Sequence, residues 1–139
     1  MAIASAVCTS FKRELLDALH DLDTDSFKIA LYTSAATLGA ATTVYTASGE
    51  ITGTGYTAGG QTLAAPAVTI SGTTIIVDFD DPAWPAATIT ARGALIYNAS
   101  KANRAVAVYD FGADKASTQG TFTVVLPTPD ASNALIRLT

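Results

Sequence analysis

The sequence predicts a mainly β protein, an antiparallel β-sandwich or jelly-roll-like domain with one N-terminal amphipathic helix. Short apolar runs, several of them with period-two alternation, recur at close spacing from about residue 26 to residue 138. Turn-forming residues separate these runs, among them Ser71-Gly72 and the proline-rich residues 127–130. Several short strands divided by turns are typical of sandwiches and jelly rolls.

Residues 10–22 have helical rather than strand periodicity. The apolar residues of this segment recur three or four positions apart: Phe11, Leu15, Leu16, Leu19 and Leu22. Thr9 and Ser10 are suitable N-cap residues, because their hydroxyls can accept a hydrogen bond from the first turn. We therefore expect one amphipathic helix, with His20 as a polar residue near its C-terminal end.

The expected strands follow this helix. They cover residues 26–33, a hairpin of 63–70 and 73–79 whose second strand turns Thr73, Ile75, Val77 and Phe79 inward, and residues 88–97, 104–111, 121–126 and 134–138. Residues 112–120 are expected to form a loop. Residues 34–61, rich in Ala, Thr and Gly, predict a long irregular excursion, and such segments tend to be functional.

Length and composition indicate a single domain over residues 1–139, since 139 residues are enough to close a hydrophobic core. Apolar residues make up 49% of the chain and charged residues 14%, against the roughly 25% charged that is usual in soluble domains. A free monomer normally keeps its solubility through interspersed charges. We therefore expect neighbouring molecules to cover much of the surface, with a homo-oligomer as the simplest arrangement.

Composition also disfavours several classes of function. The net charge is −4 and the eight Lys and Arg residues are scattered, so nucleic-acid binding is not expected. No stretch approaches the roughly 20 apolar residues of a membrane helix. The N-terminus lacks the basic and apolar regions of a secretion signal. These features predict a soluble protein made in a cytoplasm.

Three segments imitate chemical motifs without the context that those motifs need. Residues 53–58 match the pattern G-x-G-x-x-A, but no buried strand precedes them and no helix follows. Residues 21–32 begin like a calcium-binding loop, yet Ser26 and Tyr32 stand where glycine and glutamate are required. The acidic residues within 78–81 lie beside a proline at the end of a strand, which favours a turn over paired catalytic carboxylates.

A nucleophilic pair of Cys8 and His20 is also disfavoured. On one helix, the twelve residues between them correspond to a separation of roughly 18 Å, beyond hydrogen-bonding reach. We therefore predict no catalytic, cofactor-binding or metal-ligating residue and no cofactor, and we expect the protein not to be an enzyme.

Candidate interface residues come from the excursion and from one tryptophan. We select Val44, Tyr45, Ile51 and Tyr56, because residues 44–61 are expected to pack poorly on their own core and to become ordered through a partner. We add Trp84, which lies between Pro82 and Pro85, because an aromatic side chain on a rigid turn can dominate a binding interface. A position in the core of the domain is the competing interpretation of this tryptophan.

Five runs of the sequence resemble a family of small virion proteins of tailed bacteriophages. They are residues 11–16 (FKRELL), 25–33 (DSFKIALYT), 53–60 (GTGYTAGG), 89–98 (ITARGALIYN) and 104–112 (RAVAVYDFG), in the expected order. The chain is similar to head decoration, or cement, proteins. This resemblance implies an oligomer on the outer surface of the capsid that binds the major capsid protein and braces its lattice.

Two alternative functions remain open from the sequence. One is a tail or baseplate component of the same particle, since β-sandwich modules recur there and the fold alone does not determine location. The other is a carbohydrate-binding adhesion module, for which a neutral, threonine-rich β surface with Trp84 and several tyrosines would be suitable.

Overall fold

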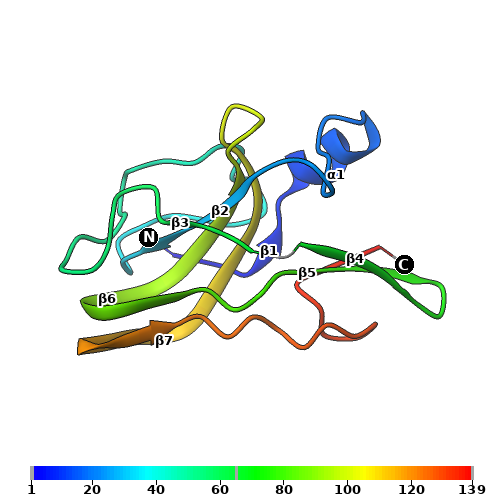
Figure 1. Ribbon diagram of the computed structural model, residues 1–139. Coiled ribbons are helices and arrows are strands. Elements are labelled where there is room, and N and C mark those ends of the chain that lie inside the picture. Colours follow the sequence, from blue (N-terminus) through cyan, green and yellow to red (C-terminus); the bar gives the residue numbers. More distant parts are fainter. Residues whose placement is uncertain (1, 65, 139) are drawn as a thin grey trace.

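The computed structural model describes residues 2–64 and 66–138, which form two antiparallel sheets and one short helix (Figure 1). The larger sheet has the order β1-β7-β6-β2-β3, and the smaller sheet has the order β4-β5-β8. The elements in chain order are β1 Ala6–Val7, α1 Thr9–Leu16, β2 Phe27–Tyr32, β3 Gln61–Thr62, β4 Ala67–Ser71, β5 Thr74–Asp78, β6 Ala83–Asn98, β7 Arg104–Thr123 and β8 Ile136–Leu138. The prediction of a mainly β fold behind one N-terminal helix is confirmed.

Strand β2 lies inside the larger sheet, between β6 and β3. Its apolar residues Phe27, Ile29 and Leu31 are buried, and so are Ala30 and Tyr32 on the opposite face. The strand predicted at 26–33 is therefore confirmed, and both of its faces are largely buried. Helix α1 contacts β7 of the larger sheet, whereas the irregular segment 34–61 lies against β2. The Tyr32 hydroxyl donates to the Thr46 carbonyl, and the Ile51 N–H donates to the Leu31 carbonyl.

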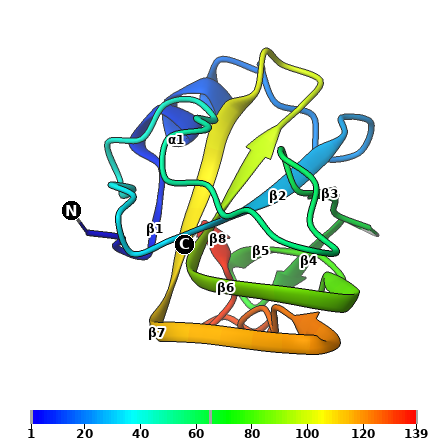
Figure 2. The same ribbon diagram turned by 90° about the vertical axis from the view of Figure 1, so that its left-hand side faces the viewer.

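Strands β6 and β7 form a long ribbon that bends across the molecule (Figure 2). The register shifts between Ala91 and Gly93, because Ala91 pairs with Lys115 whereas Gly93 pairs with Asp110. Gly112, inside this bulge, has a φ of 82°, a conformation that glycine adopts without steric cost. The expected loop at 112–120 is therefore wrong: these residues continue β7, and 115–120 pair with the first half of β6.

Strand β6 begins earlier than predicted, at Ala83, so Trp84 and Pro85 lie within a strand and not on a turn. The ladder tolerates Pro85 because the register shifts between Trp84 and Ala87, and Ala86 has a φ of 50° there. A proline at a bulge has no ladder hydrogen bond to lose. Pro85 therefore marks an irregularity within β6, whereas Pro82 lies between the end of β5 and the start of β6.

Helix α1 ends at Leu16, six residues before the predicted end. Ala18 has a φ of 60°, and the Leu19 N–H donates to the Glu14 carbonyl, which closes the last turn. The N-cap is Cys8, without a side-chain capping bond, so the expectation of Thr9 or Ser10 as the cap is wrong. Leu16 is 88% exposed, and the chain turns inward after it instead of continuing the apolar face.

The predicted hairpin is present as β4 and β5, but its inward face differs from the prediction. Thr74 and Ile76 are buried where Thr73 and Ile75 were expected, while Val77 and Phe79 are buried as expected. The hairpin extends beyond the body of the molecule, so simple alternation does not determine burial along it (Figure 1). In the predicted strand 121–126, the alternation of Phe122, Val124 and Leu126 places these three residues on one face, and all three are buried.

Candidate protein interface

The structure separates the five residues predicted to form an interface. Ile51 is 3% exposed and Trp84 is 4% exposed, so both belong to the core. Tyr45 and Tyr56 are half-buried. Val44, at 47% exposure, is the one residue of the five whose side chain is available to a partner on the surface.

Trp84 packs inside its own domain. Its ring lies 6.0 Å from that of Tyr56 and 6.3 Å, edge to face, from that of Phe122, its partner in the β6–β7 ladder. A buried indole cannot reach another molecule unless the core opens. The prediction that Trp84 stands on an exposed turn is therefore wrong, and the competing interpretation of a core residue fits its burial.

Glu50 organises the irregular excursion. Its Oε1 accepts a hydrogen bond from the Tyr45 hydroxyl at 2.7 Å, and its Oε2 accepts bonds from the Tyr56 hydroxyl and the Gly59 N–H, both at 2.7 Å. Burial, strengthened by the bond to Glu50, raises the pKa of Tyr45 to about 12. Burial also raises the pKa of Tyr56, so both hydroxyls stay protonated and donate. We call Glu50, Tyr45, Tyr56 and Gly59 the Glu50 cluster.

Backbone contacts hold the same excursion to the sheet. The Ile51 N–H donates to the Leu31 carbonyl, and the Thr88 N–H donates to the Thr54 carbonyl. Gly60 approaches β2 so closely that a Cβ there would lie 1.7 Å from the Ile29 carbonyl oxygen, and its φ is 76°. The expectation that residues 44–61 pack poorly on their own core is therefore wrong.

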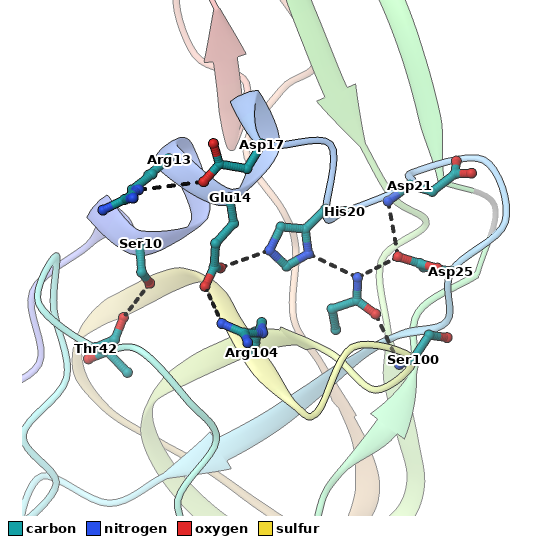
Figure 3. Close-up of polar contacts among 11 residues, drawn as sticks. Ser10, Arg13, Glu14, Asp17, His20, Asp21, Asp25, Thr42, Ser100 and Arg104 are labelled. Atoms are coloured by element: carbon teal, nitrogen blue, oxygen red, sulfur yellow. Dashed lines mark hydrogen bonds and ion pairs between the residues drawn. The ribbon is translucent and has the colours of Figure 1, made fainter.

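A second polar group joins helix α1 to the turn between β6 and β7 (Figure 3). His20 Nε2 lies 3.0 Å from Glu14 Oε1, and His20 Nδ1 lies 2.9 Å from Asn98 Nδ2. The Asn98 amide also donates to Asp25, whose other oxygen binds Lys101, and Arg104 binds Glu14. These side chains form the His20 network: Glu14, His20, Asp25, Asn98, Lys101 and Arg104.

The hydrogen bonds within the His20 network determine which ring nitrogen of His20 donates and which accepts. Asn98 Oδ1 accepts from the Ser100 N–H and Nδ2 donates to Asp25, so the Asn98 amide has one orientation only. His20 Nδ1 must then accept a hydrogen bond, and Nε2–H must donate to Glu14. Both ring nitrogens are therefore engaged in hydrogen bonds within the chain. The network is suited to joining segments of the chain and not to general-base catalysis.

The carboxylates of the His20 network are held in their charged form. Burial alone would raise the pKa of Asp25, but bonds from Lys101, Asn98 and the Asp21 N–H outweigh burial and lower this pKa to about 2. Burial alone would likewise raise the pKa of Glu14, but hydrogen bonds from His20 and Arg104 outweigh burial and lower this pKa. A carboxylate whose pKa is lowered by folding stabilises the native state above its unfolded pKa, and this contribution disappears as the pH falls.

We therefore expect acid to weaken the protein partly through Asp25. Between about pH 5 and pH 2, the wild type should lose about 2 kcal/mol more unfolding free energy than Asp25→Asn, because asparagine does not titrate. Urea unfolding at a series of pH values measures this difference. Asp17→Asn is the matched control, since Asp17 forms only an exposed ion pair with Arg13 and should follow the wild type. Parallel curves for wild type and Asp25→Asn would contradict the assignment.

Other reactive groups have structural surroundings. Burial, with a smaller effect from Glu14, raises the pKa of the Cys8 thiol to about 11, which keeps it in the weakly nucleophilic thiol form. Within residues 2–64 and 66–138, no group of three or more His, Cys, Asp or Glu side chains could hold a metal ion. No helix in this described part is long and apolar enough to cross a membrane.

The distribution of charge singles out one long part of the chain. Between Lys28 and Asp78, the only charged residue is Glu50, and its carboxylate is bound within the Glu50 cluster. Two exposed surfaces belong to this part. The first is the 34–48 loop, where Ala40, Ala41, Thr43 and Val44 are exposed. The second is strand β4, where Val68 is 53% exposed and Ile70 is 74% exposed.

Uncharged exposed surface of this extent is typical of a contact with other proteins. The sequence predicted the excursion as a contact region, and the 34–48 loop lies within it. Strand β4 was not among the interface residues selected from the sequence, because its segment was predicted only as one strand of a hairpin. The feature of the sequence that could have drawn attention to β4 is the complete absence of charge from Ile51 to Val77.

Comparisons of this chain with protein-family models, with curated proteins and with solved structures find no match. Support for a function therefore comes from the residues and contacts of the chain itself.

Proposed function

We propose that this protein is a non-enzymatic structural protein of a tailed-bacteriophage virion, a decoration protein that binds the major capsid protein on the outer surface of the head. The observation that supports the proposal best is the uncharged part of the chain between Lys28 and Asp78, whose single carboxylate is bound internally. A free domain gains nothing from such a surface, whereas a protein that packs against a lattice avoids desolvating charges.

The 34–48 loop is the proposed contact with the capsid. Its exposed residues are small or β-branched, so they lose little side-chain entropy when they become ordered at an interface. The loop is held to the body by the Tyr45 N–H bond to the Asn103 carbonyl and the Ala105 N–H bond to the Thr43 carbonyl. It is thus organised before binding, which lowers the cost of association.

The mechanism is stabilisation by linkage. A protein that binds the assembled lattice and not its separated subunits shifts the equilibrium towards assembly. Each contact can be modest, since many copies in symmetric positions act together. The resemblance of five runs of the sequence to tailed-phage virion proteins supports the same assignment.

We expect quantitative mass spectrometry to find the protein on purified heads, in a copy number that matches a symmetry position of the capsid lattice. Val44→Glu should reduce its retention on heads, because the substitution buries a charge in the contact. Thr118→Glu, on an exposed part of β7, is the matched control and should be retained. Presence on separated tails in a small copy number would contradict the decoration role and favour a tail component.

A further inference from the structure

Strand β4 forms an unpaired edge of the smaller sheet. It pairs with β5 on one side, and in the order β4-β5-β8 no other strand within the described residues 2–64 and 66–138 lies on its other side. Ala67, Val68, Thr69 and Ile70 are all exposed. The hairpin of β4 and β5 extends away from the body, so another molecule can approach this edge (Figure 1).

The usual protections of an edge strand are missing here. Soluble proteins shield such edges with charged side chains, with bulges or with a covering segment. Strand β4 has no charged residue, and its register with β5 runs without a bulge from the Ala67–Asp78 pair to the Ser71–Thr74 pair. An uncharged, apolar edge that is regular along its length is a template for another strand.

We propose that β4 pairs antiparallel with β4 of a second copy of this chain, about a two-fold axis at Thr69. The sequence of the strand, AVTIS, complements itself in this register. Val68 then lies opposite Ile70 of the second copy, Thr69 lies opposite its own equivalent, and Ala67 lies opposite Ser71. Pairs of β-branched residues and threonine pairs are favourable across strands.

The same register continues the apolar rows of the existing sheet. Within one chain, Leu138, Ile75 and Ile70 lie side by side, as do Ile136, Val77 and Val68. Pairing about Thr69 joins the row that ends at Ile70 in one copy to the row that ends at Val68 in the other copy. The result is a six-stranded sheet of order β8-β5-β4-β4-β5-β8. In an isolated copy, Val68 and Ile70 are exposed to water. The pairing partly covers both side chains, which is favourable.

The absence of charge is what favours a second copy over an unrelated partner. A two-fold axis brings Thr69 directly against its own equivalent and keeps like residues on either side of it close together, so a charged side chain there would repel its copy. An edge selected for a charged partner would instead have complementary charges. The inference rests on the proposed function only in treating the uncharged surface as a protein contact.

Charge-swap variants at Thr69 test this arrangement in the full-length protein. Sedimentation equilibrium over a range of concentrations should show a dimer for the wild type and for Thr121→Lys, an exposed control on β7. Thr69→Lys and Thr69→Glu should each raise the dissociation constant by roughly tenfold or more, because two like charges then meet on the axis. An equimolar mixture of the two variants should restore dimers, because Lys then faces Glu.

A wild type that stays monomeric, or Thr69 variants that dimerise like the control, would overturn the inference. If the variants fail to fold, hydrogen exchange of the wild type decides: the β4 amides must become more protected as concentration rises, and unchanged protection rejects the pairing. If the β4 amides become protected only when a strand of another protein is added, the edge binds that partner and not a second copy. A dimer absent from virions would overturn the proposed function alone, whereas a monomer abundant on heads would overturn this inference alone.

Discussion

Trp84→Ala should lower the free energy of unfolding by about 3–5 kcal/mol, because the substitution removes a buried indole and leaves a cavity between two aromatic rings. Trp84 is 4% exposed, so little of this loss can be recovered by hydration of the site. Urea unfolding followed by far-UV circular dichroism measures the loss. Fluorescence is unsuitable, because Trp84 is the only tryptophan of the chain.

Trp84→Phe is the matched variant for this experiment. It keeps an aromatic ring beside Tyr56 and Phe122, and we expect it to lose clearly less stability than Trp84→Ala. Val44→Ala, at an exposed position, should change stability little. An alanine variant that unfolds like the wild type but no longer stays on virions would return Trp84 to an interface and contradict the assignment to the core.

Glu50→Ala should be the second most damaging of these substitutions, with a loss of roughly 3 kcal/mol. It removes the acceptor of three hydrogen bonds and leaves the Tyr45 hydroxyl and the Gly59 N–H without their partner. The amides of residues 51–60 should exchange with solvent much faster, because the cluster holds this segment against the sheet. Hydrogen exchange and urea unfolding of the same samples measure both effects.

Two milder variants separate the contributions within the Glu50 cluster. Tyr45→Phe removes one donor while the carboxylate keeps the other two, so its effect should be the smallest. Glu50→Gln keeps the shape but turns an amide N–H2 towards a donor, so it should lie between Tyr45→Phe and Glu50→Ala. If residues 51–60 exchange in Glu50→Ala as in the wild type, their backbone bonds alone hold the segment.

Local patterns in the sequence predicted the elements whose stability comes from their own residues. Strand β2 follows from the alternation of Phe27, Ile29 and Leu31, and the buried positions Phe122, Val124 and Leu126 follow from the same period. The irregular texture of residues 34–61 was also predicted. The Glu50 cluster was open to prediction, since a lone carboxylate lies within nine residues of its three donors in an otherwise uncharged segment.

Elements that depend on distant partners were predicted wrongly. Helix α1 ends early because His20 turns inward to meet Asn98, which is 78 residues away in the sequence. Residues 112–120 have a loop-like composition, but β6 provides their hydrogen-bonding partners and makes most of them strand. Composition near the tryptophan indicated a turn, whereas the bulge at Ala86 accommodates Pro85 and leaves Trp84 in the ladder.

Periodicity and composition are properties of neighbouring residues, so they are enough to predict the β class, the N-terminal helix and the lack of charge between Lys28 and Asp78. Which apolar residues are buried follows from the folded arrangement of the chain. Val68, Ile70 and Trp84 are equally apolar in the sequence, yet the hairpin carries the first two away from the body, while the β6–β7 ribbon folds the third into the core. Burial depends on what packs against a residue from elsewhere in the chain, and local sequence does not encode that partner.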